Sequence, residues 1–167
     1  MKPNFYWCVL GVSGALFAQN PLSTDTKFWY DTIKKDIIAA AEDMPEANYS
    51  FKPAPPVRTF GEIVGHIADD EYYFCMTAKG EKPDKNFEKT LKAKADLVKA
   101  LKESFAYCDA VYSNMKDADA TKPVQSFVGP KSLLSWMSFN YAHMYEHYGN
   151  IVTYMRIKGL VPPSSKK

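Results

Sequence analysis

The sequence predicts an all-α protein that folds as one four-helix bundle, and three observations support this prediction. Four segments repeat apolar residues at steps of three and four, which places those residues on one face of a helix. Residues typical of helix starts and ends bound these segments, and no segment alternates apolar and polar residues as a strand would. The chain has 167 residues, 46% of them apolar and 24% charged, which suits a single domain with its own core.

The first two helices are defined by the residues at their ends. We expect the first to begin at Ser23, a good N-cap, and to stop before Pro45, which cannot continue a helix. The second is expected to start at Thr59, because Thr59 and Glu62 have the spacing of a capping box, and to end at Lys79–Gly80. The apolar stripe of the first helix is Trp29, Ile33, Ile37, Ala40 and Met44, and that of the second is Ile63, Ile67 and Phe74.

The third and fourth helices are expected over residues 89–115 and 132–158. In the third, the alternating steps form a seam of the kind that faces a bundle interior. Gly159 and Pro162–Pro163 close the fourth helix. The seam of the third helix consists of Val98, Leu101, Phe105, Cys108, Tyr112 and Met115.

The linkers are long, which bears on how the helices are connected. Residues 48–58 hold aromatic residues and prolines and are expected to pack on the bundle, whereas the charged segment 80–89 is expected to be exposed. Residues 117–131 are expected to form an extended connection. Linkers of this length permit crossover connections, so a strict up-down-up-down order is not required.

The first 18 residues are predicted to be a secretory signal peptide. Lys2 precedes an apolar run of eleven residues that ends in Ala18, which is too short to cross a bilayer. A buried N-terminal helix is the alternative. With cleavage after Ala18, residues 19–167 would form a single mature domain, exported to the periplasm or the extracellular space, with no other segment apolar enough to span a membrane.

Export changes the expected state of the cysteines. Cleavage would remove Cys8 and leave Cys75 and Cys108. An oxidising compartment favours a disulfide between these two, and two buried free thiols are the alternative.

The charge balance gives no sign of a nucleic-acid partner. The chain has 21 Lys and Arg against 19 Asp and Glu, a net charge of +2, and no basic run. We expect the partner to be a small-molecule substrate or ligand, and leave a homodimer open.

The three histidines of the chain are expected to meet inside the bundle. His143 and His147 are four residues apart and project from one face of the fourth helix, while His66 lies on the inward side of the second. Each alone could be a hydrogen-bonded core residue, but three on facing stripes favour one metal site. Neutral imidazoles suit a divalent transition metal such as Zn²⁺, Ni²⁺, Fe²⁺ or Cu²⁺, and three protein ligands leave a position open for water or substrate.

Several polar residues share the faces of the histidines. Asp70, four residues after His66, is the candidate catalytic base or the carboxylate that orients this histidine. Glu62, four residues before it, could do the same, although the capping box already uses it. Arg58 could bind an anionic substrate or lie on the surface. Further candidates for lining a pocket, all equally typical of a core, are Tyr73, Asn140 and Tyr154.

A competing motif lies in the fourth helix. Residues 143–147 match H-x-x-E-H, the inverted zinc-protease signature, in which Glu146 would be the general base. That class needs a further acidic ligand downstream, and no Asp or Glu follows Glu146. Glu146 is also rotated by about 100° from His147, away from the expected position of His66. We therefore set the protease interpretation aside.

The histidine pattern, with residues 51–66 (FKPAPPVRTFGEIVGH), resembles the DinB-like superfamily of metal-binding four-helix bundles, especially its exported members. The resemblance covers about residues 23–160. It implies up-down-down-up connectivity, a divalent metal held by His66, His143 and His147, and no DNA binding. Characterised members are bacillithiol- or mycothiol-dependent S-transferases and a maleylpyruvate isomerase, and many others are described as metal-dependent hydrolases. Export departs from the characterised members, because low-molecular-weight thiols are scarce outside the cytosol.

Two classes of function remain open from the sequence. The first is a metal-dependent enzyme, either a hydrolase or an enzyme like the thiol S-transferases, whose metal lowers the pKa of a bound water or thiol. The second is a non-catalytic bundle that binds a metal or a small ligand. It stays open because no unambiguous acid–base pair lies beside the histidines.

Overall fold

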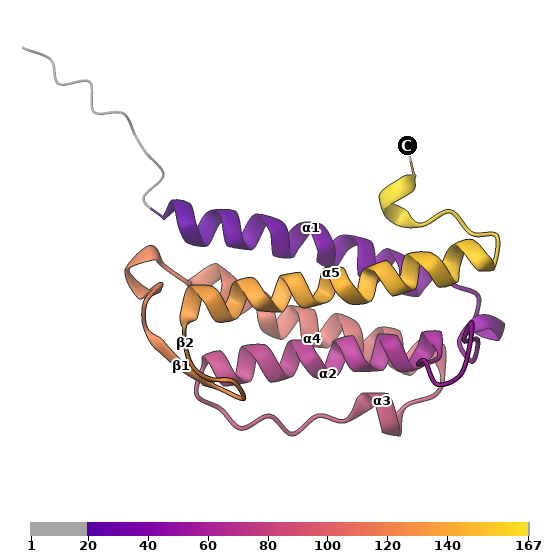
Figure 1. The fold of residues 1–167 in the computed structure, drawn as a ribbon, viewed down its shortest axis with the longest axis horizontal. Coiled ribbons are helices and arrows are strands. Elements are labelled where there is room, and N and C mark those ends of the chain that lie inside the picture. The colour runs from indigo at the N-terminus through magenta and orange to yellow at the C-terminus, as the bar shows by residue number, and fades with distance from the viewer. Residues whose placement is uncertain (1–19, 167) are drawn as a thin grey trace, which may run out of the picture.

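The computed structural model describes residues 20–166, and its long helices form the predicted bundle (Figure 1). The predicted signal peptide lies outside the described residues. No helix among residues 20–166 is long and apolar enough to cross a membrane. The all-α bundle is therefore confirmed, and its four long helices are α1 (Pro21–Asp43), α2 (Phe60–Ala78), α4 (Lys94–Asn114) and α5 (Leu133–Ile157).

The helices run up, down, down and up in chain order (Figure 1). Helices α2 and α4 are parallel, since Gly61 lies against Leu97 near their first turns and a disulfide joins them further along. Helices α2 and α5 are antiparallel, since Phe74, late in α2, packs on Trp136, early in α5. The groove between α2 and α5 is the part of this arrangement that positions the histidines.

The ends of α2 and α5 follow from local sequence. Thr59 accepts a hydrogen bond from the Glu62 amide at 3.2 Å, and the Glu62 carboxylate accepts one from the Thr59 amide at 2.8 Å, which completes the predicted capping box. Ser132 caps α5, and Gly159 follows it with a φ of 74°, a conformation that glycine adopts without steric cost.

Helix α1 differs from the prediction in its start and in its buried face. It begins at Pro21 rather than Ser23, because proline is well suited to the first helical position. Trp29 is wrong as a core residue, since it is 49% exposed, and Tyr30 is buried instead. The Tyr30 ring stacks on Tyr112 with centroids 3.9 Å apart, which sets the rotation of α1 on the bundle.

The predicted third helix is two helices. Helix α3 (Phe87–Thr90) ends before residues 91–93, which are not helical, and α4 starts at Lys94. The Asp69 carboxylate accepts hydrogen bonds from the amides of Phe87 and Glu88, at 2.6 and 3.0 Å, and so holds α3 against α2. Part of the segment expected to be exposed is therefore packed over the histidine groove.

The 117–131 connection contains a β-hairpin that the sequence analysis missed. Strand β1 (Pro123–Ser126) pairs antiparallel with β2 (Gly129–Ser132). Gly129 takes a φ of 87° after the turn residues Phe127 and Val128. Strands of four residues, one beginning with proline, are too short to show a clear alternation.

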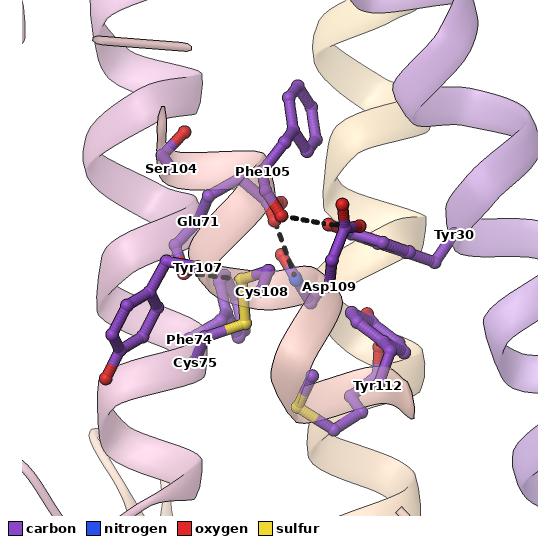
Figure 2. Close-up of a disulfide and its surroundings, with 12 residues drawn as sticks. Tyr30, Glu71, Phe74, Cys75, Ser104, Phe105, Tyr107, Cys108, Asp109 and Tyr112 are labelled. Atoms are coloured by element: carbon purple, nitrogen blue, oxygen red, sulfur yellow. Dashed lines mark hydrogen bonds between the residues drawn. A yellow bond between two sulfur atoms is a disulfide. The ribbon is translucent and has the colours of Figure 1, made fainter. Parts of the chain in front are cut away.

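The structure pairs Cys75 with Cys108 in a buried disulfide between α2 and α4, with Cα atoms 5.5 Å apart (Figure 2). One turn earlier on α2, the side chain of Glu71 lies in the core beside these residues. The Asn140 amide is 3.5 Å from Glu71 Oε2, whereas Oε1 has no hydrogen-bond partner in the part of the chain described. Burial raises the pKa of Glu71 well above its ordinary 4.5, because the core disfavours the charged carboxylate.

Candidate metal centre

The three histidines lie in the groove between α2 and α5, around the carboxylate of Asp70. Asp70 Oδ2 is 3.0 Å from His66 Nε2, 3.2 Å from His143 Nε2 and 3.7 Å from His147 Nε2. One side-chain donor atom from each of these four residues lies within 4.8 Å of the others. The i, i+4 spacings produce this cluster, because they put His66 with Asp70, and His143 with His147, on single helix faces.

The environment leaves His147 neutral and ties His143 to a carboxylate. Burial, with smaller contributions from His143 and His66, lowers the pKa of His147 to about 4. A hydrogen bond to Asp70 raises the pKa of His143 above its ordinary value, against its partial burial. His147 is thus in the form that has a lone pair for a metal at neutral pH.

This donor set fits a divalent transition metal. His143 Nε2 and His147 Nε2 are 3.0 Å apart, so their lone pairs repel unless a proton or a cation lies between them. Imidazole nitrogens that each bind one metal at about 2 Å come as close as this. Asp70 supplies an oxygen donor at the same point, and the set suits Zn²⁺, Ni²⁺ or Fe²⁺ without choosing among them.

Glu88 joins the site although the sequence analysis did not single it out. Its Oε2 is 3.2 Å from His66 Nδ1, and its Oε1 accepts a hydrogen bond from Arg58 Nε at 2.8 Å. A carboxylate on the far nitrogen of a metal-binding histidine fixes the tautomer and the orientation of the ring. Gly65 was the available signal, since glycine within a helix indicates close approach of another backbone. A Cβ at Gly65 would lie 2.8 Å from Glu88 Cα.

The other predicted residues lie at varied distances from the histidines. Glu62 is engaged in the capping box with Thr59, and Asn140 faces Glu71 in the core rather than a pocket. Tyr154 donates a hydrogen bond to the Arg58 carbonyl at 2.8 Å, so it supports the segment that carries Arg58. Tyr73 packs against aromatic residues at the far end of the groove.

Glu146 is peripheral to the cluster. Its side chain is 70% exposed and reaches only the outer nitrogen of His143, with Oε2 3.5 Å from Nδ1. A zinc-protease base would face the ligand nitrogens instead.

Two hollows of similar size lie along α5, and the first of them has His147 in its lining. One, about 340 Å³, is polar in part and is lined by Arg58, His147 and Asn150 among others. The second, also about 340 Å³, lies under the β1–β2 turn and is lined by Phe127, Trp136 and Phe139. A larger cavity of about 670 Å³, between α4 and the C-terminal end of α2, includes none of the predicted site residues.

The comparison with known families decides the relationship. The sequence profile of the DinB superfamily matches residues 30–151, a span that contains all three histidines. The chain belongs to the DinB superfamily. No curated protein matches the chain.

Solved structures share this DinB fold. A DinB-like protein from Bacillus cereus has a TM-score of 0.71 at 18% identity, over 88% of this chain and 98% of that one. A conserved protein from Enterococcus faecalis has a TM-score of 0.66 at 15% identity, over 85% and 97% of the two chains. The mycothiol-dependent maleylpyruvate isomerase has a TM-score of 0.64 at 11% identity, over 77% of this chain and 60% of its own length. At these identities the likeness shows the fold alone.

Proposed function

We propose that the protein is a metal-dependent hydrolase in which His66, His143 and His147 hold one divalent metal. The observation that carries the proposal is the convergence of three Nε2 atoms and Asp70 Oδ2 on one point. A metal bound there would lower the pKa of a coordinated water towards neutrality and polarise a substrate carbonyl.

The residues of the chain have distinct tasks in this reaction. Asp70 is the base, which takes a proton from water as the water oxygen attacks the carbonyl carbon, and returns it to the leaving oxygen or nitrogen. Glu88 and Arg58 hold the ring of His66, and burial holds His147 in its neutral form. Asp70 and His143 are only half-buried, so substrate can reach the cluster along the groove.

A thiol could replace water as the nucleophile. The mycothiol-dependent isomerase shares the fold, at 11% identity over 60% of its length. We propose water for this chain because the export predicted from its N-terminal sequence would separate it from cytosolic thiols. Mass spectrometry of the N-terminus of the protein recovered from the exported fraction tests that localisation, and an uncleaved Met1 would contradict it.

One observation favours a second candidate, a non-catalytic metal-binding bundle. Asp70 Oδ2 is near enough to all three Nε2 atoms to act as a fourth ligand, and a closed set of four ligands is typical of structural sites. Asp70→Asn separates the two functions. If Asp70 acts only as a base, Asp70→Asn keeps the metal content of the wild type. If Asp70 is a ligand, Asp70→Asn lowers the metal content.

The test begins with elemental analysis of protein purified without an affinity tag. We expect about one divalent transition metal per chain, lost in His143→Ala, and hydrolysis of a nitrophenyl ester panel that is lost in Asp70→Asn with the metal retained. Glu81→Gln is the control, because the exposed Glu81 pairs with Lys79 and not with a histidine, and this variant should keep both metal and activity. Absence of metal from the wild-type protein would overturn the proposal, and retained metal without any turnover would favour the bundle that only binds metal.

A further inference from the structure

We propose that the hollow under the β1–β2 turn binds an aryl or branched-alkyl group of the substrate, and so selects substrates that carry such a group beside the reacting carbonyl. This inference deepens the proposed function and rests on it. It assigns the hairpin, which has no role in holding the histidines, to substrate selection.

An unbroken series of aromatic contacts joins the hollow to the histidines. The Phe139 ring is 5.8 Å from the imidazole of His143 between centroids, one helical turn away. Phe139 and Trp136 are 6.5 Å apart, and Trp136 is 6.1 Å from Phe127 in the hairpin turn. Phe139 therefore belongs both to the lining of the hollow and to the surroundings of His143, and connects the two.

Three of the residues around the hollow have large apolar side chains that are nevertheless exposed to solvent. Phe127 is 66% exposed, Val128 is 55% exposed and Phe139 is 43% exposed. Isolated exposed apolar residues are ordinary, but these three line one concave surface over the buried ring of Trp136. An apolar ligand group would remove this shared surface from water, which is the largest favourable contribution such a surface can make to binding.

The two ends of the groove differ, which gives the substrate a direction. The hollow at the other side of the histidines has apolar lining residues too, but Arg58, Glu146 and Asn150 beside His147 give it charge and hydrogen-bonding groups. The hairpin hollow offers rings and a valine, with only Lys131 and Ser135 as polar lining residues. Its volume of about 340 Å³ lies within the range of small-molecule sites, which suits a substrate group rather than a protein partner.

The experiment compares two hydroxamates, which chelate metals through the same group. Acetohydroxamate carries a methyl group and benzohydroxamate a phenyl group. We expect calorimetry on the zinc-loaded protein to give a Kd about 10-fold or more lower for benzohydroxamate, from burial of the ring. The ratio should fall towards one in Phe127→Ser and Phe139→Ser. Phe28→Ser is the matched control, since Phe28 is 60% exposed on α1, away from the groove.

The outcomes separate this inference from the proposed function. Equal affinities for the two hydroxamates, or a ratio unchanged in Phe127→Ser, would overturn the apolar hollow while leaving the metal centre intact. If the protein binds no metal, the proposed function fails, and the hollow is then judged by anilinonaphthalene sulfonate fluorescence on the metal-free protein. Enhancement lost in Phe127→Ser but kept in Phe28→Ser would support the hollow, and equal enhancement in all three proteins would refute it.

Discussion

Removing the carboxylate of Glu88 should weaken metal binding although Glu88 is not a ligand. Glu88→Gln keeps the size of the side chain but replaces a charged acceptor, 3.2 Å from His66 Nδ1, with a neutral amide. The ring of His66 then loses the partner that holds its Nδ1 proton and raises the basicity of Nε2. The substitution also removes the carboxylate that accepts a hydrogen bond from Arg58 Nε.

The expected loss follows from the kind of contact. Removing the carboxylate behind a metal-binding histidine lowers metal affinity by about 10- to 100-fold, or about 1.4–2.7 kcal/mol. The Arg58–Glu88 pair adds little stability by itself, because the Arg58 side chain is 43% exposed and solvent screens the pair. Glu88→Gln should therefore change the metal Kd much more than the unfolding free energy of the metal-free protein.

Competition with a chromophoric chelator measures the metal Kd, and urea unfolding of the metal-free protein measures stability. Glu81→Gln is the control, because the exposed Glu81 pairs with Lys79 and not with a histidine. Gly65→Ala tests the same contact from the other side, because a Cβ 2.8 Å from Glu88 Cα must displace α3. A Kd for Glu88→Gln within about 2-fold of wild type would refute the reasoning.

Three further predictions concern stability and pH. Burial raises the pKa of Glu71 above its ordinary 4.5, so the folded protein holds this proton more tightly than the unfolded chain, and stability falls as pH rises above 4.5. Glu71→Gln places an amide beside Asn140, whose Oδ1 has no hydrogen-bond partner among residues 20–166. The substitution should be near neutral at about pH 4 and stabilising by about 1–3 kcal/mol at about pH 8. A difference in urea unfolding that is independent of pH would contradict this. Replacing Cys75 and Cys108 with alanine should cost about 3–4 kcal/mol, since the bridge closes a loop with a separation of 33 residues, and a melting temperature unmoved by reductant would show that no bridge forms. Asp70 raises the pKa of His143 above 6.5, so protons should compete with the metal for this histidine already at a pH above 6.5. Asp70→Asn should move this loss of metal binding to lower pH in a chelator titration.

The features that were predictable from the sequence have their causes within a few residues along the chain. Thr59 and Glu62 cap α2 through contacts three residues apart. The same local rule put His143 and His147 on one face. Each of these predictions needed only the geometry of a single helix.

The features that were missed depend on contacts between distant segments. The break between α3 and α4 follows from Asp69, which captures amides 18 and 19 residues away. Trp29 and Tyr30 are equally plausible core residues until Tyr112, on another helix, selects one of them. Periodicity describes a helix in isolation and cannot contain this information.

The candidate metal centre also combines residues placed by single helices with residues placed by contacts between distant segments, and the two groups have different chemical tasks. The nitrogen donors lie on α2 and α5, two helices whose rotation is set by a packed core, so their positions are rigid. Arg58 before α2 and Glu88 on the short α3 orient His66, and Phe127 in the hairpin turn lines the apolar hollow, so these groups come from irregular or short segments. Changes in those segments can alter the orientation of His66 or the shape of the apolar hollow without moving the histidine backbones. Substitutions at residues 58, 88 and 127, rather than at the three histidines, are therefore the ones expected to change the selectivity of the proposed hydrolase while its metal ligands stay in place.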